Sequence, residues 1–479
     1  DGVTATTLLY SYFSERGLPV TFYIPNRLDE GYGLNEPAIR KLAEQGVTLI
    51  VTVDCGVACR DEVALAKSLG VDVIITDHHE CPPSLPDAVA VIDPKRPDSS
   101  YPFSELAGVG VAFKLASALD GEGGIPSLLS RFSDLVAIGS LADVVPLVSE
   151  NRALVRMGME AIRHNPRIGL KALLEKSRST DKSPTATDLT FTVVPRINAA
   201  GRMGSAEIGV DLLLSQDSET ALSLAETLCA TNDLRRTTEQ DILKEAEAML
   251  KEQPPKAGEV CILAHEGWHH GVLGIVAARL CDRYQTPFLL LSIEGDEAKG
   301  SGRSVEGISL FDTLSAVRAH IKQFGGHAQA VGLTVETHQL ELLRQAVNEN
   351  VAIHSEPTSE YLIDYVADIH ELTVEVAREL LLLEPFGAGN PAPQIGIFGG
   401  KITEIRPVGA DGKHLKFRVS DGSGSIDGIG FSMGELYEQI FVGDYVDVVG
   451  ELEENEYRGR SSAQLNLKAI RRCNHGEGI

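Results

Sequence analysis

Two adjacent histidines stand beside carboxylates where the β-branched stretch "VDVIITDHHE" (71–80) ends. Burying charged groups without partners costs on the order of several kcal/mol, so these side chains face water or hold a cation. Asp54 ends another apolar stretch, Asp143 interrupts an apolar helix or turn, and Asp1 precedes a helix. Carboxylate and imidazole together suit Mn²⁺ and related octahedral ions, and paired ions of this kind catalyse phosphoryl hydrolysis. Alternatively, these side chains are solvated loop residues that bind no ion, but the additional carboxylates Asp54 and Asp143 argue against this interpretation.

An alternation of apolar strands and amphipathic helices must position these residues. Near-continuous Val and Ile stretches separated by helical patterns are typical of a parallel, doubly wound sheet. The predicted strands are 20–25, 47–54, 71–77 and 88–93, and the predicted helices are 3–16, 36–45 and 58–69. Ligands of such sheets bind beyond the carboxyl ends of the strands, where we expect the acidic and imidazole groups to converge.

The rest of the chain divides at two stretches rich in turn-forming residues. "PPKAG" (254–258) ends a long helix predicted over 217–253, and a second α/β pattern follows. "EPFGAGNPAP" (384–393) precedes short alternating strands that are typical of an OB-fold barrel. We therefore predict five segments: an α/β domain with the metal ligands (1–215), a connecting helix (216–253), a smaller α/β domain (254–355), a linker (356–393) and the barrel (394–479).

Composition restricts the class of protein. The chain has 479 residues and a net charge of −25, which argues against coating duplex DNA and leaves room only for a local basic cleft. No apolar run approaches the roughly 20 residues of a membrane helix, and seven cysteines without regular spacing fit a reducing compartment, so we expect a cytoplasmic protein without a membrane. A zinc site at Cys55, Cys59, His78 and Cys81 is a weaker alternative, because structural zinc sites usually show two close ligand pairs.

The motifs of the chain, taken in order, resemble those of the DHH phosphoesterase superfamily. "VTVDCG", "TDHHE", "LAGVGVAFKLA", "AIGSLADVVPL" and "PRINAAGRM" are similar to its DHH domain. "EGWHHGVLGIVAARL", "GSGRS" and "GGHAQAVGL" are similar to its DHHA1 domain, and the tail from "EPFGAGNPAP" to "ENEYRGRSSAQLNL" resembles the OB-fold of the RecJ exonuclease family. The resemblance implies a DHH domain with a parallel doubly wound sheet, joined by the long helix to a smaller α/β DHHA1 domain, and a C-terminal OB-fold.

The resemblance also implies roles for individual residues. Two Mn²⁺ or Mg²⁺ ions would be bound by Asp1, Asp54, His78 and Asp143, with Asp54 bridging them. The catalytic residues would be His79 on the scissile phosphate, Asp77 orienting the histidines, Arg202 on a phosphate and His327 beside the substrate. A pocket for a 5′ phosphate would comprise Arg27, Ser301 and Arg303. Basic and aromatic side chains on the OB-fold suit strand binding, and the candidates are Lys413, Lys416, Arg418, Tyr457, Arg458 and Arg460.

The function implied is a 5′→3′ exonuclease that degrades single-stranded DNA to 5′-mononucleotides in repair and recombination. We expect a monomer, with single-strand-binding protein and a RecQ-type helicase as candidate partners. One alternative is a DHH–DHHA1 phosphodiesterase of oligoribonucleotides or cyclic dinucleotides, which would not need the OB-like tail. The other is an inactive RecJ-like replication scaffold, against which the retained metal ligands argue.

One departure from the family pattern concerns the first motif. The family spaces two aspartates as Asp-x-Asp-Gly, and this sequence begins at the second of them, Asp1. An upstream aspartate and a histidine-bearing region would complete one of the two metals. We therefore expect Asp1 to fray and at most one metal, held through Asp54 and His78, to be well occupied.

Overall fold

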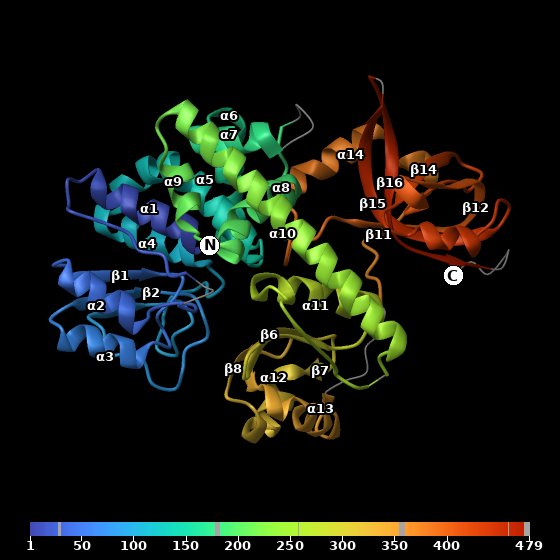
Figure 1. Ribbon diagram of the computed structural model, residues 1–479. Coiled ribbons are helices and arrows are strands. Elements are labelled where there is room, and N and C mark those ends of the chain that lie inside the picture. The colour runs from blue at the N-terminus through green and yellow to red at the C-terminus, as the bar shows by residue number, and fades with distance from the viewer. Residues whose placement is uncertain (27–29, 178–182, 257, 354–359, 458, 474–479) are drawn as a thin grey trace. The chain divides into compact units, whose positions relative to one another are not determined.

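The computed structural model describes residues 1–26, 30–177, 183–256, 258–353, 360–457 and 459–473 (Figure 1). It divides into two compact units. The first comprises Asp1–Val145 and Ser149–Thr358, and the second comprises Pro146–Val148 and Ser359–Ile479. The short segment Pro146–Val148 therefore belongs to the second unit although its chain neighbours belong to the first.

A parallel sheet opens the first unit, as the sequence predicts. Its strands β1 (Leu49–Val53), β2 (Asp72–Thr76) and β3 (Ala90–Ile92) lie in that order. Helices α2 (Glu36–Glu44) and α3 (Arg60–Ser68) cover one face, and α1 (Gly2–Ser14) and α4 (Gly108–Asp120) cover the other (Figure 1). The last residue of β1, Val53, pairs with the last residue of β2, Thr76. The residues that follow these two strands, Asp54 and Asp77, therefore emerge side by side.

The strand predicted over residues 20–25 is not formed. The segment carries no regular secondary structure, although it contains the apolar alternation of a strand. A strand is defined by its pairing, and β1, the nearest candidate partner in the sheet order, pairs only with β2 among the described residues. The outer edge of β1 is accordingly open, and Leu49 is 47% exposed.

Helices fill the middle of the first unit. They are α5 (Ile125–Asp143), α6 (Ser149–His164), α7 (Ile168–Ser177), α8 (Ala186–Met203), α9 (Glu207–Leu214) and the 35-residue α10 (Ser218–Glu252). The stretch Glu122–Asp143 is long and apolar enough to cross a membrane by length and composition alone, contrary to our expectation, but most of it is buried inside the protein. Such burial is what a core helix shows, and α5 carries the predicted ligand Asp143 at its last residue.

A second sheet closes the first unit. Its order is β4 (Cys261–Glu266), β5 (Phe288–Glu294), β6 (Glu297–Arg303), β9 (Ala330–Glu336) and β8 (Gln323–His327), and only β4 and β5 are parallel. Helix α11 (His270–Tyr284) packs on one face with the end of α10. Helices α12 (Leu310–Ala316) and α13 (Leu340–Glu349) pack on the other, beside the short pair β7 (Ile308–Ser309) and β10 (Ala352–Ile353).

The second unit is a closed barrel, as predicted. Its strands are β12 (Gln394–Val408), β13 (His414–Ser420), β14 (Ser425–Gly430), β16 (Arg460–Arg472) and β15 (Tyr445–Tyr457), and pairing of β12 with β15 closes it. The strand β11 (Tyr365–Val366) and helix α14 (Val374–Leu380) precede the barrel. At Gly428 a Cβ atom would lie 2.2 Å from the ring of Phe417, so the glycine lets the aromatic core close over it.

Candidate active site

Four of the predicted side chains converge where β1 and β2 end. His78 Nε2 lies 3.0 Å from Asp54 Oδ1. The same atom lies 3.6 Å from Asp143 Oδ2 and 3.7 Å from Asp1 Oδ2. Three carboxylates around one imidazole repel one another, and a divalent cation would relieve that repulsion. Their oxygen and nitrogen donors fit Mn²⁺ or Mg²⁺ by type.

Two overlapping groups of ligand atoms share His78. Asp54, His78 and His79 form one group, and Asp1, His78 and Asp143 form the other, with the atoms of each group within 4.8 Å of one another. Neither group contains a cysteine. Burial raises the pKa of Cys55 and Cys59 and raises that of Cys81 to about 11. The clusters found among the described residues thus combine carboxylates with imidazole and include none of the three thiols of the zinc alternative.

Asp1 is held more firmly than the sequence led us to expect. Its carboxylate accepts the N–H of Gly108 at 2.6 Å and that of Val109 at 2.8 Å, the first two residues of α4. Its side chain is only 3% exposed. Unpaired N–H groups and the helix dipole favour a carboxylate at this position. The prediction that Asp1 frays is therefore wrong, because a helix begun 107 residues later aims its side chain.

Asp54 sits in a left-handed backbone conformation, with φ of 57°. Tyr32 donates its hydroxyl to the Asp54 carbonyl oxygen, and its ring lies edge-on to His79 at 6.0 Å. A Cβ atom on Gly108 would lie 2.7 Å from Asp54 Cβ, so only glycine allows α4 to approach this closely. Sequence reasoning did not single out Tyr32 or Gly108, and proximity of Tyr32 to the predicted Arg27 was the available signal for the first.

Asp77, predicted to orient the two histidines, accepts hydrogen bonds from both of them. It accepts the N–H groups of Val57 and His78 and, at 2.7 Å, the Nδ1–H of His79. Burial raises the pKa of Asp77, but the hydrogen bonds outweigh burial and leave the pKa below its usual value. The bond from Asp77 raises the pKa of His79 against the effect of burial. With Nδ1 committed to Asp77, Nε2 is the ring nitrogen of His79 that is left for another partner, and the side chain is 41% exposed.

Asp143 ends α5 and is followed by a strained residue. Burial raises the pKa of Asp143, and the neighbouring His78 opposes that rise. The next residue, Val144, is 65% exposed and has φ of 59°. A β-branched residue in the left-handed region is a conformational outlier that costs on the order of 1–3 kcal/mol. Surrounding contacts must therefore fix the chain directly after this ligand.

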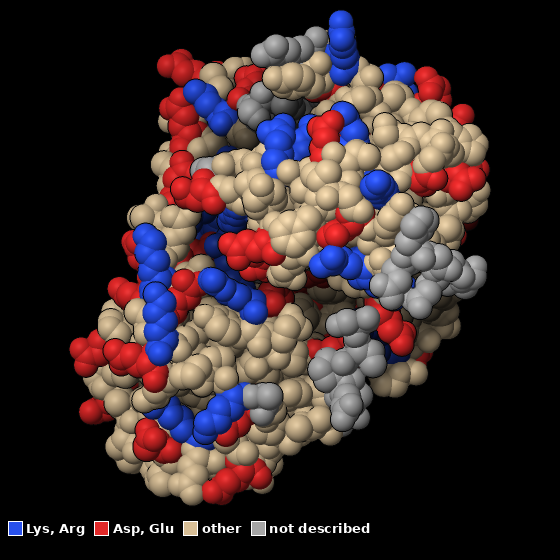
Figure 2. Space-filling model, turned by 90° about the vertical axis from the view of Figure 1, so that its right-hand side faces the viewer, with Lys and Arg blue, Asp and Glu red and all other residues tan. Residues whose placement is uncertain are grey.

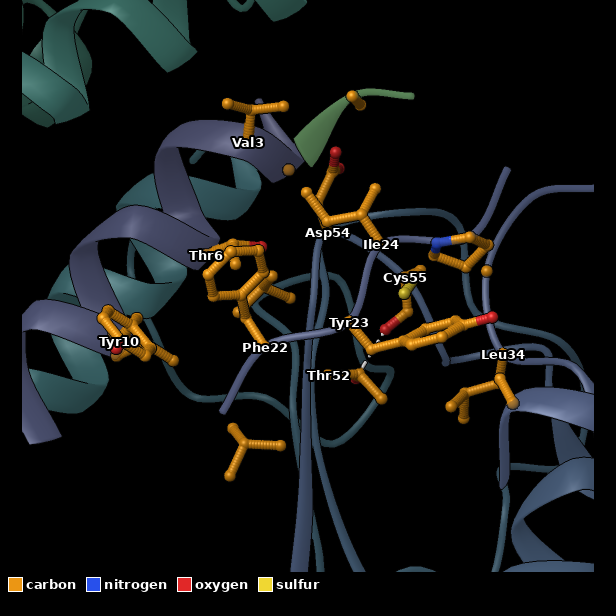
Figure 3. A pocket seen from close by; sticks show the side chains of 18 of the residues that line it. Val3, Thr6, Tyr10, Phe22, Tyr23, Ile24, Leu34, Thr52, Asp54 and Cys55 are labelled. Carbon is orange, nitrogen blue, oxygen red and sulfur yellow. Dashed lines mark hydrogen bonds between the residues drawn. The ribbon is translucent and has the colours of Figure 1, made fainter. Parts of the chain in front are cut away.

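A cavity of about 510 Å³ lies beside the metal ligands. Figure 3 shows Val3, Thr6 and Tyr10 of α1 lining one side, with Asp54 at one end. Residues 20–25 and β1 also line it, so the cavity follows the open edge of β1. Its walls are mostly apolar, whereas its end carries the carboxylates of the metal cluster.

Arg202 reaches the same cavity from α8, as its predicted phosphate contact requires. One of its guanidinium nitrogens, Nη1, donates to the Gly271 carbonyl oxygen at 3.3 Å. A Cβ atom on Gly271 would lie 2.0 Å from the Arg202 carbonyl oxygen, so the end of α8 and the start of α11 touch without a side chain between them. Arg202 thus joins the two α/β parts of the first unit at the site.

A second cluster of polar groups lies between β6 and α11. Ser301 and Arg303 point to the same face of β6, and Arg303 Nη1 donates to Ser301 Oγ at 3.0 Å. No carboxylate among the described residues pairs with Arg303, and burial lowers its pKa. A Cβ atom on Gly274 of α11 would lie 2.9 Å from Arg303 Nη2 and 3.0 Å from Ser301 Oγ. A half-buried guanidinium without a carboxylate partner suits an anion, and Gly274 keeps its approach open.

The remaining predicted residues are less informative. Arg27 and Arg458 lie outside the described residues, and His327 is exposed at the end of β8, outside both groups of metal ligands. On the barrel, Arg418 is held by Asp427 and Glu404, and Lys416 lies 4.0 Å from Asp427. Lys413, Tyr457 and Arg460 are exposed. Figure 2 shows Lys and Arg interspersed with Asp and Glu on one face, rather than a continuous basic stripe.

Comparison with known proteins accounts for these parts in order. Residues 1–140 match the DHH family N-terminal domain, residues 257–352 the DHHA1 domain and residues 363–469 the RecJ OB domain. The single-stranded-DNA-specific exonuclease RecJ of Salmonella typhimurium is 36% identical over 98% of this chain and 85% of its own length. The chain belongs to the RecJ family. The RecJ of Bacillus subtilis is 40% identical over 98% of this chain, which spans 59% of that longer protein.

A solved RecJ structure agrees with the fold. The crystal structure of RecJ in complex with Mn²⁺ from Thermus thermophilus superimposes with a TM-score of 0.84 at 30% identity. The match covers 99% of this chain and 67% of the Thermus chain. The order of a DHH domain, a DHHA1 domain and an OB-fold predicted from the motifs is therefore confirmed.

Proposed function

We propose that this member of the RecJ family is a metal-dependent exonuclease that degrades single-stranded DNA from its 5′ end to 5′-mononucleotides. The convergence of Asp1, Asp54 and Asp143 on His78 Nε2 carries the proposal, because this donor set fits the divalent ions of phosphoryl hydrolysis. Family membership supports single-stranded DNA as the substrate, since the relatives are named for it.

Each residue of the site has a chemical task in this proposal. Divalent ions, when bound, would act as Lewis acids toward the scissile phosphate and lower the pKa of the attacking water. His79, oriented through Nδ1 by Asp77, would donate from Nε2 to a phosphate oxygen. Arg202 would bind a neighbouring phosphate and compensate its charge while the strand lies in the cavity.

Recognition of a chain end would fall to Ser301 and Arg303. A terminal 5′ phosphate carries more charge than an internal phosphodiester, so Arg303, which pairs with no carboxylate in the described part of the chain, favours an end. Any larger residue in place of Gly274 would crowd both side chains, because a Cβ atom there would lie 2.9 Å from Arg303 Nη2 and 3.0 Å from Ser301 Oγ. Such a pocket would make the enzyme exonucleolytic and would set its 5′→3′ direction.

The two alternatives predict different behaviour. A phosphodiesterase of oligoribonucleotides or cyclic dinucleotides has no use for the barrel at 394–472, which is fully formed here. An inactive replication scaffold has no use for three carboxylates that converge on His78. Turnover of a long labelled strand, compared with dinucleotides, separates all three.

The test of the proposal uses Asp54, the residue placed to bridge two ions. Asp54→Ala should reduce hydrolysis of 5′-phosphorylated single strands below detection in Mn²⁺, while the circular dichroism spectrum stays unchanged. EDTA should do the same to the wild-type chain. Wild-type-like turnover by Asp54→Ala at saturating Mn²⁺ would falsify a two-metal mechanism.

We also propose a cytoplasmic monomer acting in repair and recombination, with single-strand-binding protein and a RecQ-type helicase as partners. The support is the named activity of the relatives, which requires exposed single strands. Co-purification with each partner, in the presence of a nuclease that removes bridging DNA, is the corresponding measurement. Retention of neither partner would limit the proposal to the nuclease alone.

A further inference from the structure

Tyr32 contacts the residues that follow both β1 and β2. Its hydroxyl donates to the carbonyl oxygen of Asp54, the residue placed to bridge two ions. Its ring stands edge-on to that of His79, with the ring centroids 6.0 Å apart. A Cβ atom on the next residue, Gly33, would lie 3.7 Å from Cys55 Cβ, which is ordinary van der Waals contact. This part of the chain therefore packs directly against the segment that carries a metal ligand.

The backbone of Asp54 needs a partner to hold it. Its φ of 57° lies in the left-handed region, which costs a residue with a Cβ atom about 1–2 kcal/mol. Because the Cβ atom follows the backbone, this conformation decides where the carboxylate points. The bond from the Tyr32 hydroxyl fixes the peptide group directly after Asp54. It thereby supports the placement of Asp54 Oδ1 at 3.0 Å from His78 Nε2.

Tyr32 stands in the middle of residues 30–35, which we name the tyrosine loop. Two residues of the loop have the left-handed backbone that favours glycine, and they are Gly31 and Gly33. The loop closes on itself, because Glu30 Oε2 accepts a hydrogen bond from the side-chain amide of Asn35 at 3.2 Å. Asn35 also caps α2 through its side-chain oxygen, which ties that end of the loop to a helix. The loop is therefore fastened at both ends, with Tyr32 between them.

Glu30 gathers three hydrogen-bond donors on one carboxylate. In addition to the amide of Asn35, Oε2 accepts the hydroxyl of Tyr23 at 2.6 Å, and Oε1 accepts the N–H of Asn26 at 3.1 Å. The bond from Tyr23 lowers the pKa of Glu30, and the same bond raises the pKa of Tyr23 to about 12. An ionised carboxylate only accepts, so three donors suit glutamate, whereas the amide of a glutamine would place a donor against a donor. Glu30 is therefore the anchor of the tyrosine loop.

We propose that Tyr32 is a positioning residue for the metal ligand Asp54 and that Glu30 holds Tyr32 in place. The hydroxyl of Tyr32 fixes the backbone of Asp54, so that the carboxylate is already aimed when an ion binds. Neither Tyr32 nor Glu30 has to touch the ion. The inference rests on the proposed metal centre, and it makes the tyrosine loop a determinant of metal affinity.

Two matched pairs of variants test the proposal. Tyr32→Phe removes the hydroxyl and keeps the ring beside His79. Its control is Tyr101→Phe, because Tyr101 is also exposed and donates its hydroxyl to a carboxylate, that of Glu150, outside both groups of metal ligands. Glu30→Gln and Glu150→Gln form the second pair, since each of these carboxylates accepts a hydrogen bond from a tyrosine hydroxyl.

Mn²⁺ binding to the full chain is the readout, followed by the electron paramagnetic resonance signal of the free ion. Tyr32→Phe and Glu30→Gln should each weaken Mn²⁺ binding about 10-fold, as loss of a group that orients a ligand does, and the two controls should bind as the wild type does. The double variant should bind no more weakly than Tyr32→Phe alone, because Glu30 acts through Tyr32. Excess Mn²⁺ should restore DNA hydrolysis by each variant.

Thermal melting followed by circular dichroism separates positioning from stability. Tyr32→Phe removes one exposed hydroxyl, so its melting temperature should stay near that of the wild type while its Mn²⁺ affinity falls. If Glu30→Gln does not fold, Tyr23→Phe removes one of the three donors of the anchor and should weaken Mn²⁺ binding in its place.

The outcomes separate the inference from the function beneath it. Equal Mn²⁺ affinity of Tyr32→Phe and Tyr101→Phe would overturn the positioning role of Tyr32. Losses that multiply in the double variant would overturn the link from Glu30 through Tyr32. Wild-type Mn²⁺ affinity in Asp54→Asn would instead show that the metal centre itself is misassigned. Loss of Mn²⁺ binding in Asp54→Asn, with a selective loss in Tyr32→Phe, supports both.

Discussion

Arg303 should decide how strongly the enzyme prefers a 5′ phosphate. Its guanidinium is half-buried, donates to Ser301 Oγ and has no carboxylate partner among the described residues. Arg303→Ala removes the charged donor and leaves the backbone of β6 unchanged. We expect the variant to hydrolyse 5′-phosphorylated and 5′-hydroxyl strands at nearly equal rates.

The size of the effect follows from the contacts available. A hydrogen bond to a charged group contributes about 1.5–3 kcal/mol, and a guanidinium fork can form two to one phosphate. The side chain is partly exposed, and water replaces the lost hydrogen bonds in the variant, so the net energy is smaller than the sum of two such bonds. We therefore expect a coupling of about 3 kcal/mol between Arg303 and the terminal phosphate. This energy corresponds to about 150-fold in kcat/KM.

The assay is a cycle of two proteins and two substrates. The ratio of kcat/KM for 5′-phosphate over 5′-hydroxyl is measured for the wild type and for Arg303→Ala at one salt concentration. Arg283→Ala is the control, because Arg283 is exposed on α11 and pairs with Glu247. Gly274→Ala is a second probe, since its methyl group would lie 2.9 Å from Arg303 Nη2.

Gly274→Ala also distinguishes an effect on phosphate binding from an effect on the stability of the fold. Alanine in a helix interior is more favourable than glycine by about 1 kcal/mol, so the melting temperature should not fall through the helix itself. The phosphate preference should nevertheless shrink. A wild-type chain without preference, or an Arg303→Ala chain that keeps it, would refute the assignment of this pocket.

Three further predictions concern other parts of the molecule. Ending the chain after residue 393 should weaken binding to long single strands more than it slows hydrolysis of very short ones. It should also reduce the salt dependence of binding, and an unchanged dependence of affinity on salt concentration would exclude the barrel as a DNA-binding element. Mn²⁺-soaked crystals should show anomalous scattering from an ion beside Asp54 and His78, whose side chains lie 3.0 Å apart, and soaked crystals without an ion there would contradict the assigned ligands. Asp77→Asn should lower the pKa of His79 in an NMR titration, because the hydrogen bond that His79 donates to the Asp77 carboxylate is the main cause of its rise, and an unchanged pKa would contradict the positioning role.

Local patterns predicted much of the fold and brought Asp54 and His78 to the same edge of the sheet. The Val and Ile stretches gave β1, β2 and β3, and the polar pattern over 217–253 gave α10 to within a residue at each end. Convergence of Asp54 and His78 followed from parallel strands that end together. These features depend on the spacing of apolar residues and on the direction of the strands, and both can be recognised from residues that are close together in the sequence.

Features that depend on distant partners could not be predicted. The segment 20–25 has the pattern of a strand, but pairing decides whether one forms. Asp1 is aimed by the N–H groups of Gly108 and Val109, and no local signal in the sequence connects the three. The hydrogen bond from the Leu147 N–H to the Ala388 carbonyl oxygen likewise joins residues that lie about half the chain apart.

The separation of the ligands along the chain bears on how the protein folds. Asp1, Asp54, His78 and Asp143 come from four elements that meet only when the sheet, α1 and α5 are assembled. Contacts of such long sequence separation form late, after the entropy of closing long loops has been overcome. An unfolded chain therefore offers no comparable site, and the ion binds the native state alone. At a free concentration 100 times its dissociation constant, such an ion adds about 2.7 kcal/mol to the free energy of unfolding, so that chelation should make the first unit markedly easier to denature.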